Sequence, residues 1–461
     1  MTMRTKTKNS KKRKQKVSVE QAWPLINPHA AGIDIGSREH WVAVPTDRDP
    51  QSVRCFGTCT SDLDELAQWL VKCRITSIAM EATGVYWIPA FQLLERRGLE
   101  VVLVNARQTK NVSGRKSDVL DCQWIQRLHT YGLLGASFRP ADPYCVVRSY
   151  LRYRDELVAA RSTQTQHMQK ALQQMNVQLM QVLSDINGVS GLAILAAILQ
   201  GERHPLKLAA MVDRRVKSTQ AEVAKALVGD YRAEHLFQLK TAFELYHTYE
   251  AKITACDEEL ARELEKLPDR VDVKLKPLPA KTNHKPIDES IRRGLYLKLG
   301  VDLTAIEGIG ALVALTTLTE VGPDLSRFKT EKHFTSWLGL CPDNRISGGK
   351  VLSCRTRRVV NRLSDALRLA ATTLERSQTA LGAYYRRMKA KLGAAEGVTA
   401  TAHKLARIIY RMLKHGQEYV RQGMEDFEKK HLARRLKALQ KSAESLGLQL
   451  IEKQIVTETV S

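Results

Sequence analysis

The chain has 461 residues, and 72 Lys and Arg against 49 Asp and Glu give it a formal net charge of +23. Hydrophobic residues make up 43% of it, which excludes wholesale disorder and is enough for more than one packed core. No apolar run approaches the roughly 18 residues that cross a bilayer, so no membrane association is expected. The excess of cations favours a polyanionic partner, nucleic acid ahead of a membrane surface, unless the charge serves solubility alone.

The N-terminal segment is basic and lacks a hydrophobic stretch. Residues 1–28 begin with a run rich in Lys and Arg and free of acids for its first 16 positions. They are therefore predicted to form a disordered basic tail rather than a secretory signal. The eight cysteines show no zinc-binding spacing, since Cys341 and Cys354 lack histidine partners, and we expect all of them to be reduced in the cytoplasm.

Residues 29–140 are predicted to form a mixed α/β domain. Apolar runs predict strands at 31–36, 40–45, 52–56, 75–80 and 100–104. Helices are expected where Leu63, Leu66, Trp69 and Leu70 recur at helical spacing, at 87–97, and from Ser117 onward. The predicted elements thus follow the order strand, strand, strand, helix, strand, helix, strand, helix. This is the element order of the RNase H-like fold, which RuvC-type resolvases and many transposases share.

The remaining chain is predicted to be mostly helical. Residues 141–299 hold two long helical stretches, 141–181 and 232–266, which indicate a coiled-coil arm although Glu250 and Asp257 interrupt the apolar seam. A Pro- and Lys-rich linker is expected at 267–287. Residues 300–421 are expected to form a second compact domain, and 422–461 a charged helix and tail. Near the start of the domain at 300–421, the motif Ile306-Glu-Gly-Ile-Gly is typical of a helix-hairpin-helix element. In such an element Gly308 and Gly310 let backbone amides approach a phosphate.

Four acids of the first domain are candidates for a metal site. Asp34 lies inside an apolar strand, where it is costly unless paired or bound to a metal, and Glu81 directly follows the strand at 75–80. Asp118 and Asp121 share one helix face. In an RNase H-like sheet all four carboxylates would lie close together at one end of the sheet. Because like charges repel, such a cluster requires bound cations. Oxygen ligands suit Mg²⁺, with Mn²⁺ as an alternative, and such ions assist phosphodiester chemistry. Taken singly, each acid also has an ordinary structural explanation, such as a helix N-terminal charge.

Two basic segments are candidates for nucleic-acid contact. The first precedes the last helix of the α/β domain and would grip a phosphate backbone, or form a solvated loop: Arg107, Lys110, Arg115 and Lys116. The second surrounds Ser347, which precedes Gly348 and Gly349. Its cations are Arg345, Lys350, Arg355, Arg357 and Arg358. A serine in this setting could attack a phosphate, although Ser-Gly-Gly on local chemistry alone is more simply a turn.

These motifs together resemble the DEDD insertion-sequence transposases, the "one-ten" family of bridge-RNA-guided recombinases. The resemblance rests on GIDIG, MEATGVYW and KSDVLDCQW in the first domain, then on Ile306-Glu-Gly-Ile-Gly, Trp337-Leu-Gly-Leu-Cys-Pro and Ser-Gly-Gly-Lys. It implies a RuvC-like domain that binds Mg²⁺ through Asp34, Glu81, Asp118 and Asp121. It also implies a transposase domain in which Ser347 forms a transient phosphoserine bond to DNA.

The resemblance further implies the partners. They are donor and target double-stranded DNA, a structured non-coding guide RNA and further copies of the chain in a dimer or tetramer, in a bacterial cytoplasm close to the nucleoid. Two other functions stay open. One is a RuvC-like metal-dependent nuclease or junction resolvase in which water attacks and Ser347 is structural; the other is a non-catalytic RNA-binding or architectural protein. The middle region is longer than in compact members, so residues 200–300 are expected to hold an insertion or an enlarged arm.

Overall fold

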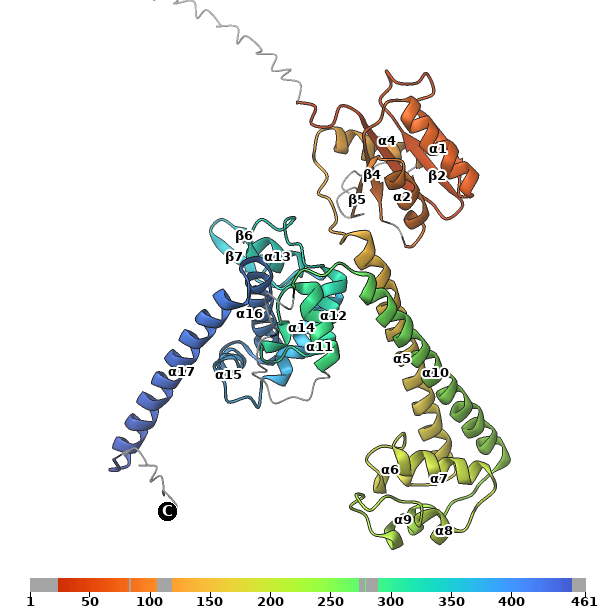
Figure 1. Cartoon of the computed structure of the whole chain (residues 1–461), viewed down its shortest axis with the longest axis vertical. Coiled ribbons are helices and arrows are strands. Elements are labelled where there is room, and N and C mark those ends of the chain that lie inside the picture. Colours follow the sequence, from red (N-terminus) through yellow and green to blue (C-terminus); the bar gives the residue numbers. More distant parts are fainter. Residues whose placement is uncertain (1–23, 83, 106–117, 273–277, 279–288, 450–461) are drawn as a thin grey trace, which may run out of the picture. The chain divides into compact units, whose positions relative to one another are not determined.

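The computed structural model describes residues 24–82, 84–105, 118–272, 278 and 289–449 (Figure 1). The chain divides into two compact units, Met1–Phe138 and Arg139–Ser461. No helix among the described residues is both long and apolar enough to span a membrane.

The N-terminal unit is built on a five-stranded sheet. Its strands are β1 (Ala30–Ile35), β2 (Glu39–Ala43), β3 (Val53–Gly57), β4 (Ser77–Glu81) and β5 (Glu100–Val104), in the order β3-β2-β1-β4-β5. β1 is antiparallel to β2 and parallel to β4, and β4 is parallel to β5. The helices are α1 (Thr60–Lys72), α2 (Trp87–Arg96) and α4 (Asp118–Thr130). The predicted mixed sheet is confirmed, and its order and directions are consistent with the RNase H-like fold.

The two faces of this sheet are covered differently. On one face Ile33 and Ile78 join apolar residues of α1 and α2 in the main core. On the other face Ala79 and Val104 pack with Ile125 of α4. Side chains alternate between faces along a strand, so every second residue of β1 and β4 is directed toward α4.

The second unit begins with a two-helix arm. α5 (Asp142–Gln174) and α10 (Ala233–Lys266) lie side by side, as Figure 1 shows. Arg161 Nη1 is 2.6 Å from Glu250 Oε2, and Arg154 pairs with Asp257. Residue numbers rise on one helix as they fall on the other, so the arm is antiparallel. The two acids that interrupt the apolar seam are therefore the partners of arginines on the facing helix.

The arm ends in a small helical subdomain. α6 (Leu179–Val182), α7 (Val189–Leu199), α8 (Pro205–Ala209) and α9 (Gln220–Ala226) enclose a core with Met168 and Leu172 of α5 and Leu239 of α10. α5 stops at Gln174, earlier than the predicted 181, because Asn176 adopts a left-handed φ of 53°. The middle region, predicted to be an insertion or an enlarged arm, thus carries its own core.

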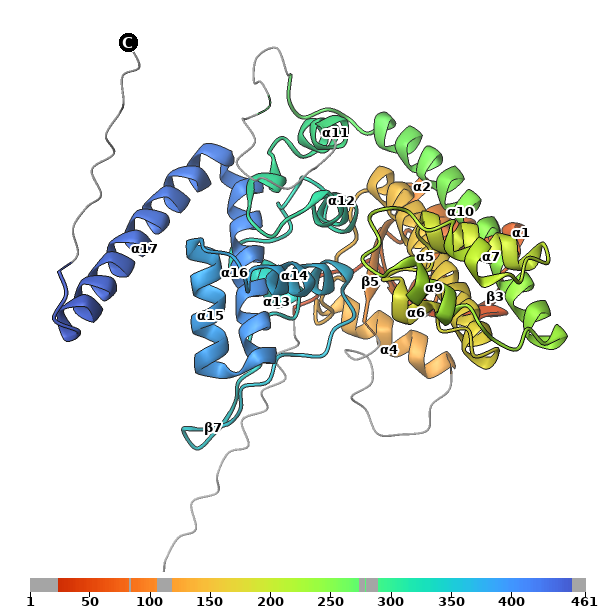
Figure 2. The same cartoon turned by 90° about the horizontal axis from the view of Figure 1, so that it is seen from below.

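The C-terminal region is mostly helical, as predicted. Its elements are α11 (Glu289–Leu299), the 3₁₀ helix η1 (Leu303–Ala305), α12 (Ala311–Glu320), α13 (Glu331–Trp337), β6 (Arg345–Ser347), β7 (Lys350–Ser353), α14 (Arg362–Thr373), α15 (Ala380–Leu392), α16 (Ala394–His415) and α17 (Gln417–Ser445). α16 packs against α13, α14 and α15 (Figure 2). The sequence grouped residues 289–299 with the arm, and α11 bonds to both neighbours: the buried Arg292 donates to Asp302 at 2.8 Å, and Lys298 Nζ donates to the carbonyl oxygen of Glu265 in α10 at 3.1 Å.

Candidate active site

Asp34 and Glu81 occupy neighbouring positions on two parallel strands. The register of β1 and β4 pairs Ile33 with Met80, so the next residue of each strand is Asp34 or Glu81. Asp34 shares its face with Gly32, and Glu81 shares its face with Ala79, which packs under α4. Both carboxylates therefore lie on the α4 side, where the two strands end.

The backbone of α4 touches the backbone of β1 at Gly32. A Cβ atom on Gly32 would lie 2.3 Å from the amide nitrogen of Gln126 and 2.4 Å from the carbonyl oxygen of Cys122. Two residues earlier on β1, the carbonyl oxygen of Ala30 accepts a hydrogen bond from Gln126 Nε2 at 3.4 Å. The helix thus runs antiparallel to the strand and comes this close because glycine has no side chain.

This direction brings the start of α4 toward Asp34. A strand rises roughly 3.3 Å per residue and a helix roughly 1.5 Å. Gly32 lies level with the stretch between Cys122 and Gln126. The two residues from Gly32 to Asp34 match about four residues of α4, which leads back into its first turn, residues 118–121. The side chain of Asp118 lies outside the described residues. Burial raises the pKa of the Cys122 thiol to about 12, and the negative charges of Asp34 and Asp121 contribute to that rise.

Of the four acids predicted to bind a metal ion, Asp34, Glu81 and Asp121 have described side chains, and these three are not grouped closely enough to hold an ion. Among the residues that the structure describes, no three His, Cys, Asp or Glu side chains gather closely enough to hold a metal ion. The donor chemistry fits a hard divalent cation, because all four candidate ligands are carboxylates. The four cations predicted to grip DNA beside this site lie outside the described residues: Arg107, Lys110, Arg115 and Lys116.

Ser347 ends the first strand of an exposed β-hairpin. It pairs with Lys350 across a two-residue turn, in which Gly348 and Gly349 have φ angles of 54° and 76°. Positive φ at both turn residues is the type I′ geometry that glycine best supports. The simple turn foreseen for Ser-Gly-Gly is thus present, and it holds the serine hydroxyl at the tip of the hairpin, exposed to solvent.

The hairpin is held at its base and not at its tip. Arg357 Nη2 donates to the carbonyl and hydroxyl oxygens of Ser336, each at 2.8 Å, and the amide of Asp343 donates to the carbonyl of Arg355 at 2.9 Å. Arg357 therefore anchors the hairpin. Arg345 and Lys350, next to the serine and its turn, are exposed, and so is Arg358.

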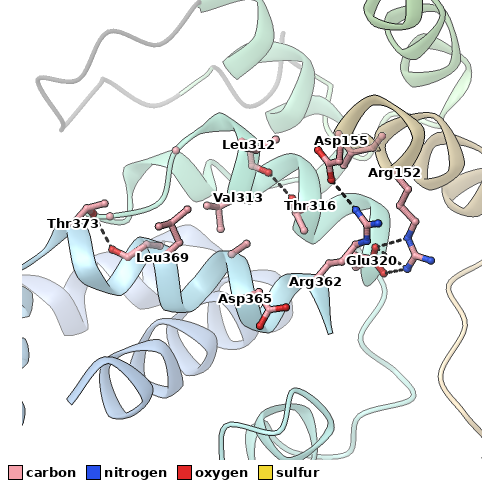
Figure 3. A pocket seen from close by; sticks show the side chains of 15 residues that line it. Arg152, Asp155, Leu312, Val313, Thr316, Glu320, Arg362, Asp365, Leu369 and Thr373 are labelled. Atoms are coloured by element: carbon pink, nitrogen blue, oxygen red, sulfur yellow. Dashed lines mark hydrogen bonds and ion pairs between the residues drawn. The ribbon is translucent and has the colours of Figure 1, made fainter. Parts of the chain in front are cut away.

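The predicted helix-hairpin-helix turn borders an apolar cavity. Gly308 has a φ of 86°, and Gly310 is the N-cap of α12. Both line a cavity of about 450 Å³ between α5, α12 and α14, with Leu312 and Leu369 among its apolar walls (Figure 3). A Cβ atom on Gly308 would lie 3.2 Å from the carbonyl oxygen of Ala370, so glycine also permits the contact with α14.

Ion pairs at one end of this cavity were not foreseen from the sequence. Arg152 makes a bidentate bond to Glu320, at 3.0 Å from Nε and 2.8 Å from Nη2, and Arg362 Nη1 lies 2.7 Å from Asp155 Oδ2 (Figure 3). The partners are 168 and 207 positions apart. No periodic or local signal links residues at such separations, so a single sequence could not reveal them.

Comparisons with known proteins identify the class of this chain. A family model for DEDD transposases, described as "Transposase", matches residues 31–177, which hold the four acids. A second model, described as "Transposase IS116/IS110/IS902 family", matches residues 302–386, which hold Ser347. Both regions are therefore those of a transposase.

The chain belongs to the IS116/IS110/IS902 family of transposases, as its motifs predicted. Among curated proteins, it is 34% identical over 127 residues to "Putative transposase y4pF/y4sB" of Sinorhizobium fredii. That match covers 25% of this chain and 32% of the relative, so the chain aligns with about a third of that protein.

Proposed function

We propose that the protein is the transposase of an insertion sequence and that it cleaves and rejoins donor and target double-stranded DNA. The observation that carries the proposal is that Asp34 and Glu81 lie on the same face of the sheet, beneath α4, whose first turn contains Asp118 and Asp121. A family match over the same residues supports a DNA-processing role for these acids.

The acids are assigned to metal binding. Asp34, Glu81, Asp118 and Asp121 would hold Mg²⁺, or Mn²⁺ in its place. When bound, such an ion stabilises the negative charge that develops on phosphate oxygens. Four carboxylates brought together around DNA would need a cation between them, because like charges held close repel one another.

Ser347 is assigned as the nucleophile. Its Oγ forms a bond to a DNA phosphorus while one backbone P–O bond breaks, and its proton passes through solvent to the released strand oxygen. A free strand hydroxyl then attacks the phosphoserine and restores both the phosphodiester and the serine hydroxyl. The number of P–O bonds is unchanged, so the exchange needs no external energy source. Arg345 and Lys350 stabilise the charged oxygens around phosphorus.

Two kinds of nucleic acid are assigned as partners of the protein. DNA is the substrate, and a structured guide RNA selects the sites by base pairing, as the family resemblance implies. The net charge of +23 supports a large phosphate footprint. The acids of one protomer would act with the serine of another in a dimer or tetramer.

Covalent trapping tests the proposal. The protein is incubated with end-labelled DNA from the element's own ends and with RNA transcribed from the same element, and the products are run on a denaturing gel. The wild type should retain label as a protein–DNA adduct, and Ser347→Ala should not. Ser353→Ala, in the same hairpin but without flanking glycines, is the matched control and should form the adduct. Unchanged recombination by Ser347→Ala would instead favour the water-using nuclease.

A further inference from the structure

The last helix is attached to the rest of the protein along its first half only. The amide of Asp302 donates to Gln417 Oε1 at 3.1 Å, Lys404 Nζ lies 5.2 Å from the centre of the Phe427 ring, and the amide of Ala380 donates to Glu428 Oε1 at 2.8 Å. Beyond Glu428 no described residue makes a hydrogen bond or ion pair with another element. Figures 1 and 2 show this part of α17 running clear of α15 and α16.

The free half of α17 carries an apolar stripe. Leu432, Leu436 and Leu439 are 54%, 52% and 46% exposed, and Leu446 at the end of the helix is 72% exposed. With Ala443, these residues are spaced four, three, four and three apart. This is the alternation of the two core positions of a coiled-coil heptad, with Leu436 and Ala443 at position a and the others at position d. Such a seam is built to meet a second helix of the same kind.

The charges of the same segment are sorted relative to this seam. The cations Lys430, Arg434, Lys437 and Lys441 fall at heptad positions b and f, on the side away from the seam. The positions that flank the seam hold Ala433 and Gln440 at e, and Arg435 and Ser442 at g.

This arrangement permits an identical helix to pair. In a parallel pair each g residue faces the following e residue of its partner, so Arg435 would face Gln440 of the second copy rather than another cation. We propose that residues 432–446 form a parallel two-stranded coiled coil with the same segment of a second copy of this chain. The outward cations then remain available to phosphates. The proposal goes beyond the proposed chemistry and does not depend on it.

Site-specific cross-linking of the full chain provides the main test. Three exposed cysteines, Cys55, Cys59 and Cys354, are first replaced by serine. Into this background Leu439→Cys places a thiol on the seam, and Lys441→Cys places one two residues away on the outer side. The protein is treated with nuclease and mildly oxidised. A disulfide-linked dimer should form with Leu439→Cys and remain at background with Lys441→Cys. Equal cross-linking at both positions, or none at either, overturns the proposal.

The same experiment distinguishes a second copy of the chain from nucleic acid as the partner that covers the apolar stripe of α17. If the Leu439→Cys cross-link forms only before nuclease treatment, the stripe packs on a nucleic-acid complex and the proposal is wrong. Charge substitution gives an independent readout by analytical ultracentrifugation. Leu436→Glu with Leu439→Glu should raise the dimer dissociation constant at least about tenfold. Arg434→Glu with Lys441→Glu, which changes the outer face and keeps the helix content, should change it less than about twofold. An unchanged dissociation constant in the seam variant contradicts the proposal.

Discussion

A single methyl group on Gly32 should separate the first strand from the helix that carries two of the candidate metal ligands. A Cβ atom at this position would lie 2.4 Å from the carbonyl oxygen of Cys122, and ordinary contact begins at 3.4 Å. The atoms in contact belong to the helix backbone, which cannot rotate away as a side chain would. In Gly32→Ala, α4 must therefore move outward by about 1 Å.

The displacement has a cost in stability and a larger one in activity. Overpacking of this kind destabilises a folded protein by about 1–3 kcal/mol. On the proposed function, the same movement carries Asp118 and Asp121 away from Asp34 and Glu81. A shift of about 1 Å in a catalytic group lowers a rate by about 100-fold. We thus expect a variant that folds, unfolds at lower urea and recombines DNA about two orders of magnitude more slowly.

Tryptophan fluorescence during unfolding in urea measures the loss of stability of the N-terminal unit, because five of the six tryptophans belong to that unit. Strand exchange on labelled DNA measures the activity. Gly294→Ala is the control, since a Cβ atom there, in helix α11, meets nothing within 4 Å. It should stabilise its helix by up to about 1 kcal/mol and leave the rate unchanged. A Gly32→Ala protein with wild-type stability and wild-type rate would refute the close packing of α4 on β1, and with it the proposed convergence of the acids.

Three further outcomes follow from the structure. Asp34→Asn should abolish strand cleavage, because the proposed function assigns this carboxylate to metal binding; cleavage at the wild-type rate would exclude Asp34 from the site. Burial lowers the pKa of His129, which lies 2.8 Å from the Ser77 hydroxyl. The unfolded chain then takes up a proton that the folded imidazole resists, so stability is complete above about pH 6.5 and falls as the pH drops below it. His129→Gln should flatten that fall in urea titrations, and an unaltered slope would contradict this origin. DNA affinity should fall steeply between 50 mM and 200 mM salt, by about 10³-fold or more, as counterions are released; a flat response in a filter-binding assay would count against a large phosphate footprint.

The sheet was predictable because its strands are short apolar runs separated by turns. Every predicted strand of the N-terminal domain is present in the structure within a few residues, and α10 (Ala233–Lys266) matches the predicted 232–266 closely. The end of α5 was not predictable in the same way. Its Gln-rich sequence continues without a Pro or Gly, and only the left-handed Asn176 and the buried Val177 after it show that the chain turns into the core of the subdomain.

Residues whose partners lie far away in the sequence were misread or overlooked. Glu250 and Asp257 look like flaws in an apolar seam until Arg161 and Arg154 are placed opposite them. Glu320 has no distinguishing context in the sequence, yet its carboxylate accepts three hydrogen bonds from the Nε and Nη2 atoms of Arg152. Periodicity reports which face of an element is buried, but it carries no information on which distant charge lies across that face.

The two halves of the proposed chemistry differ in how firmly the fold holds them. Asp34 and Glu81 stand on adjacent strands under a helix in backbone contact with the sheet, which fixes their spacing. Ser347 stands at the tip of a two-stranded hairpin whose Ile346 and Leu352 are 61% and 69% exposed. The hairpin is anchored at its base by Arg357 and Asp343, while its tip is exposed, so we expect bound nucleic acid or another protein surface to fix the position of the serine for attack. On the proposed function, this asymmetry would keep the nucleophile from acting on DNA until the complete assembly has formed.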